Sequence, residues 1–257
     1  MQDEHQKFLD VALEAVKKAE PVFLASFGNA IGIRQKTDAR KSKVTDSDKE
    51  IERILVEAIS KRFPDHAIVG EEGASKAGAV YTWYIDPIDG TTNYIRGIAH
   101  CSISLALWDV HGPLIAVVSD PVRSVTFTAL RGGGAFKNGT PLHISATASL
   151  AGSIGDLGWD WGDKESRAAL IAKIEKGAYR WRIFSGSALE MCMVASGQID
   201  FFASISIHAW DFAAAALIVK EAGGTVTDMK GDDIMASSTT ILATNGRLHR
   251  ELLATLT

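Results

Sequence analysis

The sequence predicts a mixed α/β (α+β) fold made of two halves that meet near residue 145. Two amphipathic helical patterns open the chain, and a series of strand patterns separated by turn residues follows them. From residue 146 onward, helical patterns alternate with short strand patterns. We therefore expect residues 1–145 to form N-terminal helices plus an antiparallel sheet, and residues 146–257 to form an α/β half. With 257 residues, 46% of them hydrophobic, the chain can bury the core of one large domain or two small ones.

The N-terminal helices are predicted from apolar residues at helical spacing. Residues 4–27 show this spacing, although Pro21 should kink or divide the helix because its nitrogen cannot donate a hydrogen bond. Residues 32–43 are polar and basic, and we expect them to form a loop or a hairpin. A second helix should begin within residues 45–48, where three side chains can cap it, and end at residues 63–64.

The remaining elements are expected in sequence order. In the first half we expect strands at residues 67–69, 80–85, 101–108, 114–118 and 124–130, with turns at 111–113, 120–121, 132–134 and 138–139. In the second half we expect helices at residues 166–176, 188–196 and 212–222, and strands at 152–157, 180–184, 199–203 and 240–244. Asn138-Gly139 is a strong hairpin signal, because both residues tolerate the positive φ of a tight turn.

The composition argues against several classes of partner. The net charge is −4 with no block of basic residues, so we expect no nucleic-acid partner. No secretory signal is visible, and no apolar run approaches the ~20 residues that span a bilayer, so we expect no membrane association. Cys101 and Cys192 lie in apolar contexts without metal-ligand spacing, which favours buried, reduced thiols. A cytoplasmic protein is the expectation that fits these features.

The segment 83–93 is the most informative part of the chain. An apolar strand pattern ends there in Asp86 and Asp89, two carboxylates three residues apart. Pro87 fixes φ between them, and Gly90 permits a tight turn before a helix that the next three residues would open. Free N–H groups at a helix start attract anions, so the two carboxylates make sense if cations lie between them and a phosphate. The segment therefore predicts a metal-dependent phosphatase.

Carboxylates from three separated clusters are candidates for one site. The clusters are Gly70-Glu71-Glu72, Asp86-Pro87-Ile88-Asp89 and Trp210-Asp211. Each carboxylate lies at a predicted strand end or helix start, where its side chain can face a cleft. Carboxylates ~4 Å apart repel by about 4 kcal/mol per pair at an effective dielectric of about 20, and cations offset that repulsion. Ligation by oxygen alone favours Mg²⁺, with Mn²⁺ as the alternative, over Zn²⁺.

The same residues belong to a longer series of motifs. The series is Val44-Thr45-x-x-Asp48, Gly70-Glu71-Glu72, Asp86-Pro87-Ile88-Asp89-Gly90-Thr91-Thr92-Asn93, Gly134-Ala135-Phe136-x-Asn138-Gly139, Gly186-Ser187-Ala188, Trp210-Asp211-x-Ala213-Ala214 and Glu221-Ala222-Gly223-Gly224. It resembles the inositol monophosphatase family of Mg²⁺-dependent, lithium-sensitive phosphomonoesterases, over essentially the whole chain. The resemblance implies a layered αβαβα sugar-phosphatase-like fold, an active site in the cleft between the halves, and a homodimer.

The resemblance also implies metal ligands. Glu71, Asp86 and the Ile88 carbonyl would hold a first, tighter ion. Asp86, Asp89 and Asp211 would hold a second ion, and a loosely bound third would lie near Glu71. Two to three Mg²⁺ ions are therefore expected per active site.

The catalytic and phosphate-binding roles follow from the same resemblance. Thr91, hydrogen-bonded toward Glu71 or Asp48, would help to deprotonate the metal-activated water that attacks phosphorus. Asp48 would assist the third ion through water. The backbone N–H groups of Gly90 and Thr91 would cradle the phosphate.

Several of these side chains have a second interpretation. Asp48, Asp89 and Asp211 can each cap a helix instead of binding metal. Glu72 can be a solvated neighbour of the ligand before it, and His208 a structural residue at the rim of the site. Their roles stay open at the level of the sequence.

The substrate side departs from the family pattern. The resemblance places substrate contacts at Asp89, Trp159, Gly186, Ser187, Ala188 and Ser204. Members that act on inositol phosphates or on histidinol phosphate carry an acidic residue seven positions before the metal-binding Asp, where this chain has Ser204. Trp159 stands where the family often has a small hydroxyl residue, so it would narrow the pocket, offer a face to a ring, or pack at a domain edge.

These patterns together predict Mg²⁺-dependent hydrolysis of a small phosphate monoester, with inositol 1-phosphate or a related polyol or sugar phosphate as the expected substrate. A histidinol-phosphate phosphatase is the alternative within the same class. A nucleotide 3′-phosphatase is less favoured, since those enzymes tend to carry Leu and Lys where this chain has Ile88 and Thr92. The alternative from another class is a non-catalytic binding module with the same fold, although every matched metal carboxylate is present.

Overall fold

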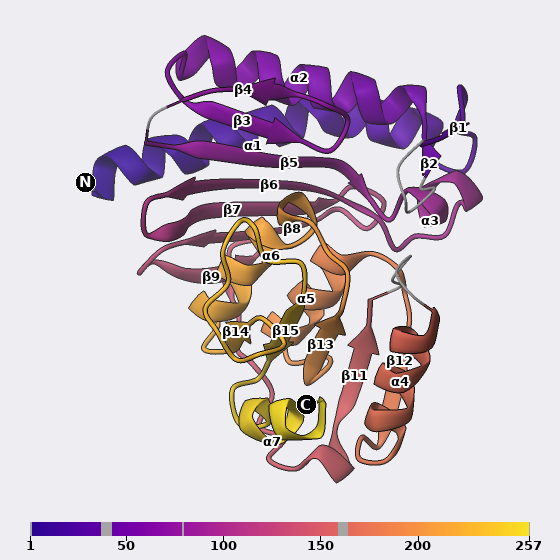
Figure 1. Ribbon diagram of the computed structural model, residues 1–257. Coiled ribbons are helices and arrows are strands. Elements are labelled where there is room, and N and C mark those ends of the chain that lie inside the picture. The colour runs from indigo at the N-terminus through magenta and orange to yellow at the C-terminus, as the bar shows by residue number, and fades with distance from the viewer. Residues whose placement is uncertain (1, 37–42, 79, 159–163, 257) are drawn as a thin grey trace.

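The computed structural model describes residues 2–36, 43–78, 80–158 and 164–256. Over these residues the chain forms five layers, in the order helices, sheet, helices, sheet, helices (Figure 1). Of the described strands, eight form the large sheet, five form the small sheet and two form a separate hairpin. The layered αβαβα fold expected from the sequence is confirmed. The large sheet belongs to the first half of the chain and the small sheet to the second.

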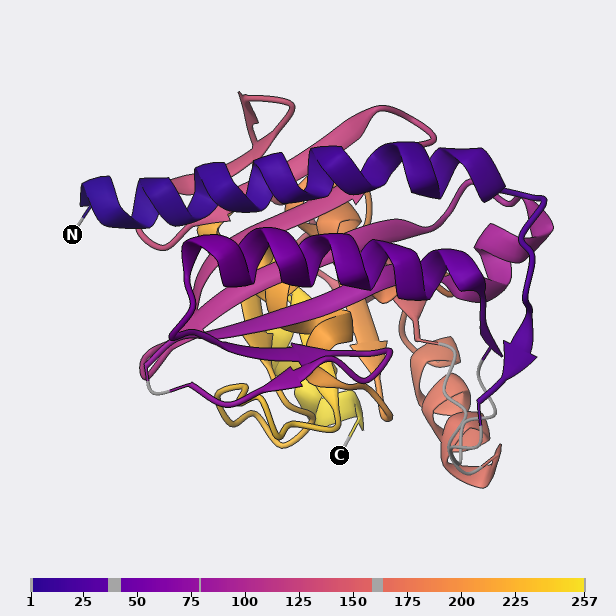
Figure 2. The same ribbon diagram turned by 90° about the horizontal axis from the view of Figure 1, so that it is seen from above.

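Two long helices cover the outer face of the large sheet. Helix α1 Gln2–Ser26 and helix α2 Asp46–Arg62 lie side by side there (Figure 2). Helix α1 continues through Pro21, so the proline does not divide the helix as the sequence had suggested. Pro21 is exposed, and the Lys17 carbonyl that loses its donor there can therefore bind water.

The start of α2 is fixed by its own residues. Thr45 and Asp48 form a capping box, in which the Asp48 carboxylate accepts from the Thr45 N–H at 2.7 Å. The segment before it is the hairpin of β1 Arg34–Gln35 and β2 Lys43–Val44, consistent with the predicted loop or hairpin. The cap and the hairpin together place the N-terminal end of α2 near the end of the large sheet that carries the acidic motifs.

The large sheet is mixed but mainly antiparallel. In spatial order its strands are β10 Thr140–Pro141, β9 Gly134–Lys137, β8 Val125–Leu130, β7 Gly112–Asp120, β6 Ser102–Asp109, β5 Thr82–Asp89, β3 Ala67–Gly70 and β4 Ser75–Lys76. Only β3 and β5 pair in parallel among these strands of the described chain. Strands β6 and β7 are buried along nearly their whole length because helices cover both faces of the sheet.

The middle layer consists of α5 Ser187–Ala195 and α6 Ala209–Glu221, between the two sheets. Helix α6 is apolar on almost all sides, as expected for a helix enclosed by protein. Its alanines let the sheet approach closely, and the Trp108 indole N–H donates to the Ala213 carbonyl at 3.3 Å. This packing joins the two halves of the chain through a shared core.

The small sheet and its outer helices complete the second half. In spatial order its strands are β12 Arg180–Arg182, β11 Ile154–Leu157, β13 Phe201–Ser204, β15 Ile241–Thr244 and β14 Thr225–Thr227. Strand β11 pairs in parallel with β12 and β13, and β15 pairs antiparallel with β13 and β14. Helices α4 Lys164–Glu175 and α7 His249–Leu256 cover the outer face, and a 3₁₀ turn, Leu150–Gly152, precedes β11.

Short elements escaped the sequence analysis. Strands β4 and β14 are too short to show an alternating pattern, and α7 lies beyond the last predicted element.

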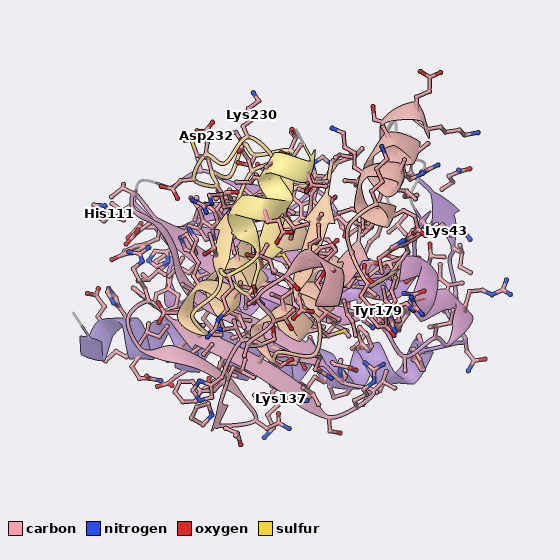
Figure 3. All side chains as sticks on the ribbon, turned by 90° about the horizontal axis from the view of Figure 1, so that it is seen from below. Lys43, His111, Lys137, Tyr179, Lys230 and Asp232 are labelled. Carbon is pink, nitrogen blue, oxygen red and sulfur yellow. The ribbon has the colours of Figure 1, made fainter. Side chains whose placement is uncertain are left out.

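Cys101 and Cys192 are buried and free, as predicted. Charged side chains such as Lys230 and Asp232 project from the surface (Figure 3). In the described part of the chain, no helix has both the length and the apolar character needed to cross a membrane.

Candidate active site

The end of β5 presents two of the expected metal ligands across a β-bulge. The pairing of β5 with β6 shifts in register between Asp86 and Asp89. Pro87 cannot donate to the ladder, and the Ile88 N–H bonds to Asp86 Oδ1 at 3.1 Å. The strand therefore continues through Asp89 instead of ending at Asp86 as predicted. The bulge changes the direction of the side chains, which is a common use of bulges beside active sites.

Strand β3 brings Glu71 next to Asp86. Gly70 is the last residue of β3 and pairs with Ile85 of β5, and the Glu71 N–H donates to the Ile85 carbonyl at 3.1 Å. The side chains of Glu71 and Asp86 lie within hydrogen-bonding reach of one another. Because these two strands are parallel, their last residues meet at the same edge of the sheet.

The fourth carboxylate comes from the second half of the chain. Asp211 lies in the first turn of α6, and its Oδ2 accepts from the His208 N–H at 2.7 Å, so it also caps the helix. Burial is the main cause that raises the pKa of Glu71, Asp86 and Asp89 above ordinary values, and the negative charge of Asp211 raises each further. The four carboxylates therefore share one electrostatic environment.

Asp89 makes a second connection between the halves. Its Oδ2 accepts from the Ala188 N–H at the start of α5 at 2.9 Å, and from the Ser102 hydroxyl at 3.4 Å. This backbone donor favours the ionised form of Asp89, while burial opposes it. A buried carboxylate in this position must take up a proton or lie beside a cation.

Lys36 provides a positive charge at this site in the described chain. Its ammonium lies 2.8 Å from Glu71 Oε1 and 2.6 Å from Glu72 Oε1, and its side chain is only 15% exposed. Burial alone would lower the pKa of Lys36, but the two carboxylates raise it well above its ordinary value. Glu72 is therefore an ion-pair partner of Lys36 and not simply a solvated neighbour.

The donor set fits a hard divalent cation, since it consists of carboxylate and carbonyl oxygens. Among the described residues, no three His, Cys, Asp or Glu side chains are already spaced as a formed metal site. The hydrogen bonds above give the reason: Glu71 contacts Lys36, Asp89 contacts Ala188, and Asp211 turns toward its own helix start. The residues are gathered, but one carboxylate oxygen of each of Glu71, Asp89 and Asp211 is hydrogen-bonded to a protein group.

Helix α3 Thr91–Arg96 begins directly after these ligands, as predicted. Gly90 precedes it with φ of 83°, and a Cβ there would lie 2.9 Å from the His100 carbonyl oxygen, so only glycine fits. The Thr91 hydroxyl donates to the Ile88 carbonyl at 3.0 Å. That carbonyl is the acceptor of Thr91 here, in place of the carboxylates expected from the sequence.

Asp48 is completely buried beside this group. Burial raises the pKa of Asp48 to about 7, and hydrogen bonds from Thr45 lower it by less. Its Oδ1 has no hydrogen-bond partner among the described atoms. Asp48 therefore caps α2 with one oxygen and keeps the other available toward the charges of Glu71 and Glu72.

The expected substrate contacts lie at the start of α5 and the end of β13. Gly186 and Ser187 open α5 immediately before Ala188. Ser204 is 2% exposed, and its hydroxyl donates to the Ser206 carbonyl at 3.1 Å. Trp159 lies outside the described residues.

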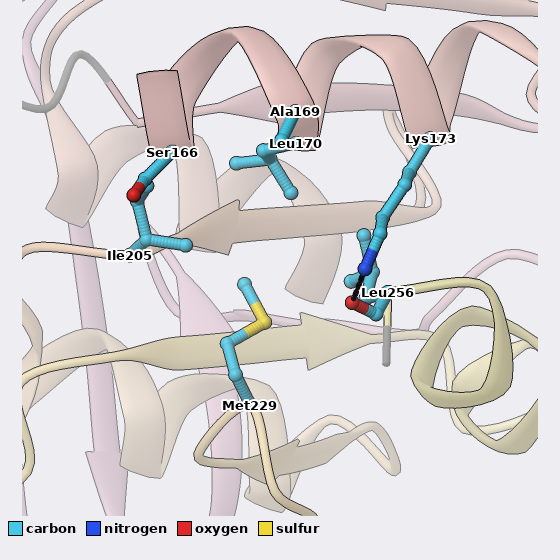
Figure 4. A pocket seen from close by; sticks show the side chains of 7 residues that line it. All are labelled: Ser166, Ala169, Leu170, Lys173, Ile205, Met229 and Leu256. Atoms are coloured by element: carbon cyan, nitrogen blue, oxygen red, sulfur yellow. Dashed lines mark hydrogen bonds between the residues drawn. The ribbon is translucent and has the colours of Figure 1, made fainter. Parts of the chain in front are cut away.

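A separate cavity of about 410 Å³ lies between α4 and the C-terminal helix (Figure 4). Its wall includes Leu170, Ile205 and Met229, and the Lys173 ammonium donates to the Leu256 carbonyl at its edge. No carboxylate is found among the described residues that line it. The carboxylates expected from the sequence therefore lie in the acidic site and not in this cavity.

Comparisons with known proteins identify the family of this chain. The profile of the inositol monophosphatase family matches residues 4–257. The chain belongs to the inositol monophosphatase family. This is a phosphatase family. A fructose-1,6-bisphosphatase/inositol-1-monophosphatase of Thermotoga maritima is 37% identical over 95% of this chain and 93% of its own. The Nus factor SuhB of Escherichia coli is 33% identical over 96% of this chain and 95% of its own.

Solved structures of the family have the same fold. The Thermotoga maritima IMPase superposes with a TM-score of 0.90 at 36% identity, covering 97% of this chain and 96% of that one. An inositol monophosphatase from Anabaena superposes with a TM-score of 0.85 at 31% identity, covering 98% and 95%. The layered fold is therefore that of the family.

Sequence reasoning missed several residues around the site. Lys36 appeared only as one of several basic residues in a polar segment, with no pattern to distinguish it. Asp156 and Glu190 form a buried acidic pair near Asp89, and burial raises the pKa of both. A charged residue within the apolar run 188–195 was the available signal for Glu190.

Proposed function

We propose that this chain is a Mg²⁺-dependent phosphatase acting on small phosphate monoesters of polyols or sugars, such as inositol 1-phosphate. The observation that carries the proposal is the convergence of Glu71, Asp86, Asp89 and Asp211 from both halves into one acidic group, in which Asp86 and Asp89 are buried. Three of these carboxylates have a pKa raised first by burial, so divalent cations would stabilise their ionised forms. Membership of a phosphatase family supports the same reaction class.

The ligand assignments follow the sequence motifs. Glu71, Asp86 and the Ile88 carbonyl would hold one ion, and Asp86, Asp89 and Asp211 a second, with a weaker third near Glu71. When bound, Mg²⁺ or Mn²⁺ lowers the pKa of the attacking water and stabilises the negative charge on the leaving oxygen. The hard-oxygen donor set supports this choice of ions.

The protein's own groups would bind and orient the phosphate. We propose that the backbone N–H groups of Gly90 and Thr91 bind the phosphate. Only glycine fits at position 90 of this turn. The Thr91 hydroxyl, turned from the Ile88 carbonyl toward Glu71 or Asp48, would accept a proton from the attacking water and pass its own to the carboxylate. Asp48 has a free oxygen for this and a pKa raised to about 7 by burial.

The name of a relative supports the substrate class. That relative, at 37% identity, is named for both fructose 1,6-bisphosphate and inositol 1-phosphate chemistry. Ser204 does not separate the candidate substrates, because members that act on inositol phosphates and on histidinol phosphate both carry an acid at this position. Its hydroxyl donates to the Ser206 carbonyl within its own turn.

A non-catalytic role is the second candidate, because several relatives are named Nus factors.

We further propose a homodimer in the cytoplasm, inhibited by lithium. Multi-angle light scattering on the purified protein would measure the oligomer directly, and a mass equal to one chain would contradict the dimer.

A substrate panel tests the proposal. Phosphate release would be measured from inositol 1-phosphate, fructose 1,6-bisphosphate, histidinol phosphate and a nucleoside 3′-phosphate, with Mg²⁺ and with a chelator. We expect release from the first two and loss of activity with the chelator. Preference for histidinol phosphate would favour the alternative enzyme, and release from none of the four would favour the binding module.

A further inference from the structure

Glu52, on the buried face of α2, contacts the turn that carries Glu71. Its side chain reaches the turn between β3 and β4, which lies directly beneath α2 (Figure 1). Glu52 Oε2 accepts from the Glu72 N–H at 2.9 Å, and Oε1 accepts from the Ala74 N–H at 2.9 Å. The residue is only 6% exposed. One carboxylate thus satisfies two backbone donors of the same turn.

The turn is shaped to receive this carboxylate. A Cβ on Gly70 would lie 2.2 Å from Glu52 Oε2, so glycine at this position leaves the space that Glu52 occupies. The turn closes on itself through a hydrogen bond from the Gly70 N–H to the Ala74 carbonyl at 2.8 Å. Contacts on both flanks of Glu71, at Gly70 and at Glu72, therefore depend on Glu52.

The chemistry of the side chain matters as well as its size. Two carboxylate oxygens match two backbone N–H groups, and hydrogen bonds to a charged acceptor are stronger than neutral ones. Glutamine offers one oxygen, and its amide N–H₂ would face the second backbone N–H. A buried donor left without a partner costs about 1–3 kcal/mol, so the turn would shift to find another acceptor.

We propose that Glu52 is a positioning residue for the cation site, holding the Gly70–Ala74 turn so that Glu71 faces Asp86. The inference rests on the proposed function, since it assigns Glu71 to a metal ion. Glu52 does not touch the reacting atoms. It acts through the backbone from which the ligand projects, in the way that outer partners orient metal ligands.

Binding of Mn²⁺ alone tests this role without substrate. Free Mn²⁺ would be measured by electron paramagnetic resonance during titration of the wild type, Glu52→Gln and the control Glu57→Gln. Glu57 is exposed on the same helix and pairs with Arg53, so its substitution changes the charge of α2 without touching the turn. We expect Glu52→Gln to weaken the tightest Mn²⁺ site by about 10-fold, and the control to bind as the wild type does.

Turnover separates positioning from simple stability. In the folded Glu52→Gln protein we expect kcat to fall and more Mg²⁺ to be needed for half-maximal activity, with little change in the KM for inositol 1-phosphate. A lower unfolding temperature with unchanged Mn²⁺ affinity would show that Glu52 only stabilises the fold, and would overturn the proposal. If Glu52→Gln does not fold, Gly70→Ala provides the same test, because its added methyl group would displace Glu52 from the turn.

The outcomes also distinguish this inference from the proposed function. A wild type that binds Mn²⁺ and hydrolyses phosphate esters, with Glu52→Gln binding Mn²⁺ equally well, overturns the positioning role alone. A wild type that neither binds Mn²⁺ nor hydrolyses any ester overturns both.

Discussion

The two halves of the site are built in different ways. Glu71 directly follows β3, Asp86 and Asp89 belong to the adjacent strand β5, and the register of these two strands brings the three residues together. Asp211 and Ala188 belong to helix starts in the second half, and only packing between the halves brings them to the same place. The part of the site from the large sheet is therefore fixed by strand pairing, whereas the part from the second half, which includes Asp211, depends on how the halves dock.

Specific hydrogen bonds join the two parts of the site. Asn93 Nδ2 donates to the Phe184 carbonyl at 2.6 Å and to the His100 carbonyl at 2.9 Å, which links helix α3 to the segment before α5. The Ala188 N–H donates to Asp89. We therefore expect substitutions in the part from the large sheet to change hydrolysis directly. Substitutions in the part from the second half should change it through these hydrogen bonds.

The largest expected effect comes from removing a ligand in the large sheet. Asp89→Asn keeps the shape of the side chain and an oxygen for the Ala188 N–H, but removes a buried charge. We expect hydrolysis to fall at least about 100-fold, the upper end of what loss of an outer-shell partner costs. Steady-state phosphate release measures it, with Asp232→Asn on the exposed surface as the control. Activity within twofold of the wild type would remove Asp89 from the metal site.

A smaller effect is expected when the contact from the second half is removed. Ala188→Pro deletes the N–H that donates to Asp89, at a position in the first turn of α5 where proline is tolerated. A hydrogen bond to a charged group contributes about 1.5–3 kcal/mol, so kcat/KM should fall roughly 10- to 100-fold. Ala188→Gly keeps the N–H and serves as the matched control. Equal kinetics for the two variants would show that the contact is not needed.

The buried pair Asp156 and Glu190 should make stability depend on pH. Burial raises the pKa of Asp156 to about 8 from an ordinary value of 3.8, so the folded protein holds a proton there that the unfolded chain releases. Stability from this proton is complete below pH ~4 and is lost as pH rises toward about 8. Asp156→Asn should flatten this dependence in urea unfolding measured between pH 5 and 8. Parallel curves for the variant and the wild type would contradict it.

The smallest expected effect lies in the second half, away from the cleft. His249 contacts the hydroxyls of Thr227 and Thr244 at 3.0 and 3.1 Å, and burial lowers its pKa. The unfolded chain takes up the proton first, near pH 6.5, so the contribution of His249 to stability is lost as pH falls below that value. His249→Gln should reduce the acid sensitivity of the unfolding midpoint without changing activity at neutral pH. An unchanged acid profile would exclude His249 as its source.

The sequence predicted the parts of the molecule that depend on neighbouring residues. The turn at Gly90 and the start of α3 at Thr91 follow from one short segment, and the division into two α/β halves follows from the order of helical and strand patterns. The αβαβα layering was implied by the resemblance to the family. The strand was expected to end at Asp86, where its apolar run stops, but the bulge lets β5 continue to Asp89.

Residues that act across the fold could not be found this way. Glu52 sits between apolar helix positions, and its contact with the turn depends on the distance between α2 and β3. Lys36 directly follows β1, and its ion pair with Glu71 joins residues 35 positions apart in the sequence. The sequence shows Ser204 as a departure from the family pattern. The hydrogen bond from its hydroxyl to the Ser206 carbonyl depends on the folded turn and could not be predicted.

The central claim is that the gathered carboxylates require divalent cations, and thermal unfolding with and without Mg²⁺ tests it most directly. A ligand that binds only the folded state stabilises it by about 2.7 kcal/mol at 100 times its Kd. The wild type should therefore unfold at a clearly higher temperature in excess Mg²⁺ than in chelator, and Asp89→Asn should lose most of that increase. Equal unfolding temperatures for the wild type in both conditions would contradict the account.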